Sequence, residues 1–345
     1  MKVKYIFLIL ILLVVAGIST IFIPKAPETP LPEPVTPVIV SIDKTFDDQK
    51  PIRDKLLAML DEKDPNSIFK IVDTIQADPA LSINCHNIAH DIGHKTYKLY
   101  GFNEAMTMDN PEHVNHALVE NICAGGYVHG VLEELSLYDP EFAKRPDAIC
   151  DTLPTASRAS CFHGMGHVYM LMNNQDTVAA IRDCRVIKED FDTYRCFEGV
   201  RMEQFWGPFA TAESSEKPLE LCSALVNEDE RPTCFLYSTF GYLRTHVRDY
   251  AGASALCTKS GLPESDTQFC LKGLGLTMMS KFKGKNLHQS EQYVVGLPIL
   301  QKLAFYQGVV GYATISGLTD GAITNACNLL TTDSQICLSA LASRE

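Results

Sequence analysis

The sequence has few basic residues and little charge overall. It contains 30 Lys and Arg against 42 Asp and Glu, which gives a formal net charge of −12. This charge repels phosphate backbones and removes the counterion release that drives nucleic-acid binding, so nucleic acid is excluded as a partner. Only 21% of the residues are charged and 46% are hydrophobic, which excludes a disordered chain and leaves ample apolar surface for a core in 345 residues.

The sequence also lacks the short motifs that usually assign a chemistry. It has no H-E-x-x-H and no C-x-x-C-H, which excludes the common zinc-protease signature and covalent haem attachment. A phosphate-binding loop, a dinucleotide fingerprint and a nucleophile elbow are absent too. Without a C-x-x-C pair, the cysteines lack the tight knuckles of structural zinc sites. Any chemistry must therefore come from residues that the fold assembles.

The first hydrophobic segment predicts a membrane anchor. Residues 5–23 form an uncharged apolar run, about as long as the roughly 20 residues that a bilayer-spanning helix requires. Lys2 and Lys4 precede the run, and only Lys25 follows it closely. The positive-inside rule then predicts a single-pass protein with residues 1–4 in the cytoplasm and the main domain outside, in a periplasmic or extracellular space.

The end of this run distinguishes an anchor from a signal peptide. Gly17 and Ser19 resemble a weak cleavage site, so a cleaved signal peptide is the alternative. The apolar run continues past them to Ile23, which favours an uncleaved anchor. The next segment, residues 24–40, contains six prolines and predicts a semi-rigid stalk that holds the following domain off the membrane.

Residues 41–345 are predicted to form an extracytoplasmic domain of repeats. A short phrase, with glycine three residues after its first residue in most copies, recurs at spacings of 38, 35, 38, 36 and 35 residues; the copies begin at Cys123, Cys161, Cys196, Cys234, Cys270 and Phe305. Turn-forming loops separate a short amphipathic segment from a longer apolar one in each copy, which indicates helical hairpins. We therefore predict an all-α, disulfide-stapled α-solenoid with a period of 35–38 residues. In period alone it resembles tetratricopeptide-like and HEAT-like solenoids, which implies an architecture and no activity.

The twelve cysteines predict six disulfides. Five upstream cysteines precede a downstream one by a nearly fixed gap, so local pairing is the simplest connectivity, and the two left over pair with each other. The predicted pairs are Cys85–Cys123, Cys150–Cys161, Cys184–Cys196, Cys222–Cys234, Cys257–Cys270 and Cys327–Cys337. Disulfides persist in oxidising compartments, which agrees with export across the membrane. Thiolate metal ligation and shuffled pairing are the alternatives.

Eight of the ten histidines lie within one stretch of 82 residues, between His86 and His167. His90 and His94 are four residues apart, as are His163 and His167, so each pair shares a helix face. Internal alignment superimposes these two pairs. In a third repeat it places His129 with Glu133 in the corresponding position. The fourth repeat contributes Glu198 and Glu203 at or near this face. The predicted metal ligands are His90, His94, His129, Glu133, His163 and His167, with His86 and Glu198 as outer or alternative ligands.

This set predicts a transition-metal site, because imidazole with one or two carboxylates suits Zn, Fe, Cu or Mn. Helices of adjacent repeats pack about 8 to 10 Å apart, near enough for their imidazoles to converge. Five histidines exceed the three protein ligands of a typical catalytic zinc centre, which leaves room for two ions or for an outer role. An open coordination position would activate water or dioxygen, so a metal-dependent enzyme remains one form of this function.

Structural explanations compete with this prediction. The histidines are alternatively a ladder of packing residues in a membrane-tethered scaffold that binds a peptide or envelope protein on the concave face of the solenoid. Repeated aromatic residues suit such a face or the core equally well: Tyr127, Tyr169, Phe197, Phe240 and Tyr242. The repeated glycines indicate either close helix packing or a ligand against bare backbone: Gly93, Gly126, Gly164, Gly166, Gly199, Gly273, Gly275 and Gly308.

We expect a protease site inserted into residues 24–40 to make the main domain releasable from membranes, because the anchor is the predicted attachment. Membranes carrying the full chain are treated with the matching protease, and pellet and supernatant are compared by immunoblotting. The same chain without the inserted site should stay in the pellet. Release without protease would instead indicate a cleaved signal peptide.

Overall fold

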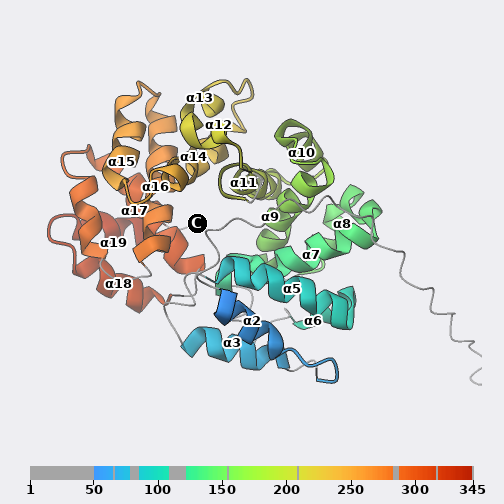
Figure 1. Cartoon of the computed structure of the whole chain (residues 1–345). Helices are drawn as coiled ribbons and strands as arrows, with labels where there is room; N and C mark the ends of the chain where they lie inside the picture. The colour runs from blue at the N-terminus through green and yellow to red at the C-terminus, as the bar shows by residue number, and fades with distance from the viewer. Residues whose placement is uncertain are drawn as a thin grey trace, which may run out of the picture. The chain divides into compact units, whose positions relative to one another are not determined.

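The computed structural model describes residues 50–64, 67–77, 85–108, 122–153, 155–207, 210–282, 287–315 and 318–343, all within the unit formed by residues 35–345. Every regular element in these ranges is a helix, so the described part of the protein is all-α (Figure 1). The predicted anchor over residues 5–23 and the stalk over 24–40 lie outside the described ranges. No helix within them combines the length and the apolar character needed to cross a bilayer.

Long helices alternate with short ones along the chain (Figure 1). After α2 (Lys50–Ala58) and α3 (Ser67–Ala77), the long helices are α5 (His86–Tyr100), α7 (Gly126–Tyr138), α9 (Thr155–Met172), α11 (Asp190–Trp206), α14 (Arg231–Thr245), α16 (Glu264–Phe282) and α17 (Ile299–Ile315). The short elements are α6 (Phe102–Met108), η2 (Ile122–Gly125), η3 (Pro140–Lys144), α8 (Pro146–Cys150), α10 (Thr177–Cys184), α12 (Ala212–Glu216), α13 (Pro218–Ser223), α15 (Tyr250–Lys259), η4 (Leu287–Tyr293), α18 (Asp320–Asn328) and α19 (Ser334–Ala342). Each long helix packs against the next long helix along the chain.

Local sequence explains where the short helices begin. The Asp176 carboxylate accepts the backbone N–H groups of Val178 and Ala179 and thereby caps α10. The Thr319 hydroxyl caps α18 in the same way. Such caps satisfy N–H groups that have no partner inside the helix and contribute about 1 kcal/mol each.

Six disulfides hold neighbouring elements together. The twelve cysteines form the six pairs that their spacing predicts: Cys85–Cys123, Cys150–Cys161, Cys184–Cys196, Cys222–Cys234, Cys257–Cys270 and Cys327–Cys337. Five of the bonds close loops of 10 to 13 residues and join a short helix to the helix that follows it. In the chain-entropy model, each such loop stabilises the fold by about 3 kcal/mol. Cys85–Cys123 differs, because it spans 38 residues and joins the start of α5 to η2.

The repeated aromatic residues belong to the core. Tyr127, Tyr169, Phe197 and Phe240 are all buried. The hydroxyl of Tyr127 donates to the carbonyl of Ala105 at 2.8 Å, and the hydroxyl of Tyr169 makes the corresponding bond to Ala143 at 2.7 Å. These two tyrosines therefore tie α7 to α6 and α9 to η3, which is a packing role. Tyr242 differs, since it is only half-buried and stacks on a neighbouring imidazole.

Glycines bring the backbones of neighbouring long helices into direct contact. A Cβ at Gly130 on α7 would overlap the carbonyl oxygen of His90 on α5, and a Cβ at Gly199 on α11 would overlap that of His163 on α9. Gly308 on α17 meets α16 in the same way. Close helix packing is therefore the role of these glycines, and it places the side chains that flank them within reach of each other.

We expect Gly199→Ala to lower the free energy of unfolding by about 2 kcal/mol or more, because overpacking a tight contact costs about 1–3 kcal/mol. The matched control is Gly311→Ala on α17, where a Cβ would meet nothing within 4 Å. Alanine should stabilise that helix by up to about 1 kcal/mol. Guanidinium unfolding with intact disulfides measures both. Equal stability of the two variants would contradict the close contact.

Candidate metal centre

The candidate residues lie on four consecutive long helices. Those on α5 and α9 are spaced by four residues, so each set forms a row along one face of its helix. The candidates are His86, His90 and His94 on α5, His129, Glu133 and Glu134 on α7, His163 and His167 on α9, and Glu198 and Glu203 on α11. His113 and His116 lie outside the described residues.

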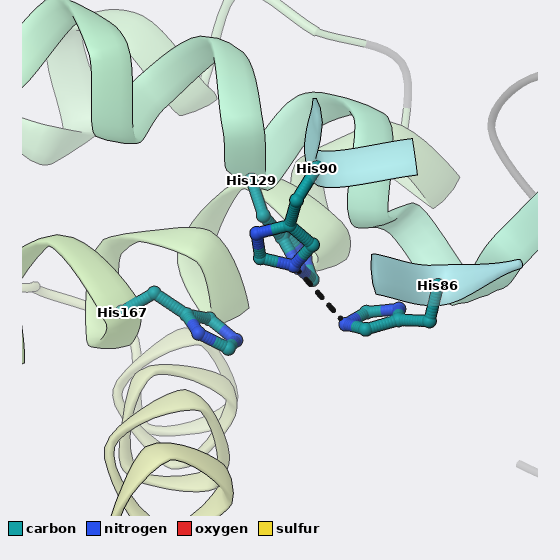
Figure 2. Close-up of side chains that lie close together, drawn as sticks. All are labelled: His86, His90, His129 and His167. Atoms are coloured by element: carbon teal, nitrogen blue, oxygen red, sulfur yellow. Dashed lines mark hydrogen bonds between the residues drawn. The ribbon is translucent and has the colours of Figure 1, made fainter. Parts of the chain in front are cut away.

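Four imidazoles from three helices converge on one place. His86, His90, His129 and His167 each offer a ligand atom, and these atoms lie within 4.8 Å of one another. Figure 2 shows the four rings turned toward a common space. The ring centroids of His86 and His90 are 4.9 Å apart, and those of His129 and His167 are also 4.9 Å apart. This buried cluster has a geometry that could hold a metal ion.

Three of the four rings are oriented through Nδ1. The Nδ1 contacts are His86 to the Cys123 carbonyl at 2.6 Å, His90 to the Glu133 carboxylate at 3.1 Å, and His167 to the Glu203 carboxylate at 2.6 Å. A ring whose Nδ1–H donates to an oxygen carries its lone pair on Nε2. The Nε2 atoms of His86 and His90 lie 3.2 Å apart (Figure 2). Metal-binding histidines are commonly held in this way, with Nδ1–H on a carbonyl or carboxylate.

Other ring nitrogens of the cluster are buried without a partner. Both nitrogens of His129 and the Nε2 atom of His167 have no hydrogen-bond partner among the described residues. His129 is completely buried. Burial, assisted by neighbouring imidazoles, lowers the pKa of His129 well below its ordinary value and lowers the pKa of His86 to about 3. Both rings are therefore neutral at pH 7, with lone pairs available to an ion.

His94 lies beside the cluster and makes different contacts. Its Nδ1 lies 2.9 Å from the Glu134 carboxylate, and its Nε2 lies 2.9 Å from the Glu133 carboxylate. Burial lowers the pKa of His94, but the hydrogen bonds to Glu133 and Glu134 outweigh it and raise the pKa to about 9. At neutral pH the ring is an imidazolium with both N–H groups in use. In the structure without an ion, His94 is therefore a cation between two acids.

Two other predicted residues also fall outside the group of four. The ring of His163 stacks on His129 with centroids 5.0 Å apart, and both of its nitrogens are buried without a partner among the described residues. Glu198 forms an ion pair with Arg195, and burial raises the pKa of its carboxyl. The carboxylate that reaches the cluster from α11 is Glu203. The sequence feature that points to Glu203 is an acidic residue on the long helix that follows each pair of histidines. Glu134 on α7 contacts His94 of α5, and Glu203 on α11 contacts His167 of α9 in the same way.

A second group of potential ligands adjoins the first. Glu133, His167 and Glu203 offer three atoms that also lie within 4.8 Å of one another. The side chains of Glu133 and Glu203 are 14% and 16% exposed, and that of His167 is 2% exposed. His167 belongs to both groups, because its two nitrogens face different neighbours.

We expect His94 to stabilise the metal-free protein at acidic and neutral pH. Its folded pKa of about 9 exceeds the ordinary value of about 6.5. The stabilisation is therefore complete below about pH 6.5 and is lost as the pH rises through about 9. Urea unfolding of wild type and His94→Gln at pH 6, 7.5 and 10 should show a difference that shrinks with rising pH. A difference independent of pH would mean that His94 is neutral.

No protein-family model, no curated protein and no solved structure matches this chain. The geometry of the centre consists of four converging imidazoles, three of them oriented by oxygen acceptors, inside an all-α domain with six disulfides.

Proposed function

We propose that the protein binds a transition-metal ion through His86, His90, His129 and His167. The observation that supports the proposal is that the two nitrogens of these rings have different surroundings. Nδ1 of three rings is engaged by an oxygen atom, whereas the remaining nitrogens meet one another or have no partner among the described residues. A buried polar atom without a partner costs about 1–3 kcal/mol, and an ion at the centre of the cluster would supply the missing partner.

The donor set indicates which ions fit. Neutral imidazole nitrogen suits zinc, copper and iron, and the adjoining carboxylates extend the range to manganese. A tetrahedral ion with metal–nitrogen bonds of about 2.0–2.1 Å holds its ligand atoms roughly 3.3 Å apart. The Nε2 atoms of His86 and His90 are already at 3.2 Å, so this edge of the site needs no rearrangement.

We place this function outside the cytoplasm. Six disulfides indicate an oxidising compartment. The uncharged run over residues 5–23 supports a single anchor with the N-terminus in the cytoplasm, and residues 24–40 support a stalk. Because hairpins stapled by disulfides pack in chain order, we further propose that the domain is an α-solenoid.

The alternative function, a scaffold that binds a protein partner, has less support. A scaffold would need the repeated aromatic residues on an exposed binding face, and four of the five are buried in the core. A packing role for the histidines would require partners for their nitrogens, and His129 has none among the described residues. Metal binding accounts for the same nitrogens directly.

Elemental analysis of the full chain, purified in mild detergent, tests the proposal. Wild type should retain at least about one equivalent of a transition metal, whereas the double variant His90→Ala/His167→Ala should retain less than about one-tenth, since both rings supply ligands from different helices. The matched control is His246→Ala/His288→Ala, which also removes two histidines, both exposed. A wild type without metal, or a site variant that keeps all of it, would refute the proposed site.

A further inference from the structure

One imidazole of the proposed centre belongs to two ligand groups at once. The Nε2 atom of His167 faces the other three histidines, and its Nδ1 atom lies 2.6 Å from Oε1 of Glu203. On this second side, Oε1 of Glu133 lies 3.8 Å from the same Nδ1. The two carboxylates thus approach Nδ1 of His167 from α7 and α11.

The distance between Oε1 of Glu133 and Nδ1 of His167 fits two ligands of one ion better than it fits a hydrogen bond. A distance of 3.8 Å from oxygen to nitrogen is too long for a hydrogen bond. It is within the range for two atoms that bind the same ion at about 2.0–2.2 Å each. Oε2 of Glu133 contacts His94 at 2.9 Å, and both carboxylate oxygens lie 3.1 Å from Nδ1 of His90, which fixes the carboxylate beside His167.

The second group also has the charge and burial of a cation site. Two carboxylates with atoms within 4.8 Å of each other repel when both are ionised, and burial strengthens that repulsion. A divalent cation between them removes it. The imidazole of His167, nearly completely buried, offers the third ligand. Carboxylate oxygen with one imidazole nitrogen suits zinc, iron or manganese.

We propose that the centre holds two metal ions bridged by His167. This inference rests on the proposed metal-binding function and specifies how many ions that function involves. The first ion is bound by His86, His90, His129 and Nε2 of His167, and the second by Glu133, Glu203 and Nδ1 of His167. When the second ion binds, the Nδ1–H bond that donates to Glu203 breaks, a metal–nitrogen bond forms, and one proton leaves to solvent. No electrons are transferred.

Zinc stoichiometry of the full chain tests the second site. Metal-stripped protein in mild detergent is dialysed to equilibrium against Zn²⁺, and zinc per chain is counted after removal of free ion. Wild type should bind two equivalents and Glu203→Gln one, because an amide keeps the shape of the side chain and loses its charge. The matched control, Glu198→Gln, makes the same change on the same helix, outside both ligand groups, and should bind two.

Copper provides an independent test of the bridge. Two Cu²⁺ ions joined by one imidazolate couple magnetically, so the electron paramagnetic resonance signal of copper-loaded wild type should integrate to well under two spins per chain. Copper-loaded Glu203→Gln should show one uncoupled spin. Circular dichroism confirms that each variant is folded.

The outcomes separate the two proposals. One zinc in both wild type and Glu203→Gln overturns the second site and leaves the four-histidine site intact. Two zinc ions in Glu203→Gln, or two uncoupled copper spins in wild type, overturn the bridged arrangement. No bound metal in wild type overturns this inference together with the proposed function.

Discussion

Direct backbone contact between long helices determines what the side chains of this domain can reach. At Gly130 and Gly199 the absence of a Cβ lets a helix rest on a carbonyl of its neighbour. Beside the Gly130 contact, the rings of His90 and His129 meet across the interface, with centroids 5.2 Å apart. The same contact recurs between α16 and α17, where a Cβ at Gly308 would overlap the carbonyl of Lys272. There the neighbouring residues are Lys272 and Leu276, and no imidazole is present. Helix packing is thus common to both halves, whereas the candidate metal ligands belong only to the first.

The disulfides make this packing compatible with a polar interior. Burial of several imidazoles and carboxylates costs desolvation free energy that an apolar core of the same size would not incur. Five local disulfides reduce the entropy of the unfolded chain and offset part of that cost. The sixth acts closer to the site. Cys85 directly precedes His86, and the carbonyl of Cys123 accepts the Nδ1–H of that ring, so the disulfide fixes the position of the first histidine of the cluster.

The sequence predicts features that depend on residues close together in the chain. It does not predict features that depend on contacts between separate helices. Fixed gaps between cysteines predict five of the pairs, because each hairpin closes locally, and the sixth, Cys85–Cys123, follows by elimination. The spacing of four predicts that His90 and His94 share a face, which they do. Their different contacts depend on how α7 is rotated, and no pattern within α5 encodes that rotation. Similarly, Glu198 and Glu203 are five residues apart and point about 140° apart around α11, so only one of them can face the cluster.

A comparison of two equivalent pairs shows what turns a histidine into a candidate ligand. His94 pairs through Nδ1 with Glu134, and His167 pairs through Nδ1 with Glu203. The residue before the acid is Glu133 in the first pair and Met202 in the second. Glu133 takes the Nε2 of His94, so that ring is held as a cation between two carboxylates. A methionine offers no carboxylate, and the Nε2 of His167 is left to face the cluster. The two rings therefore differ at Nε2, which contacts a second carboxylate in His94 and has no partner among the described residues in His167.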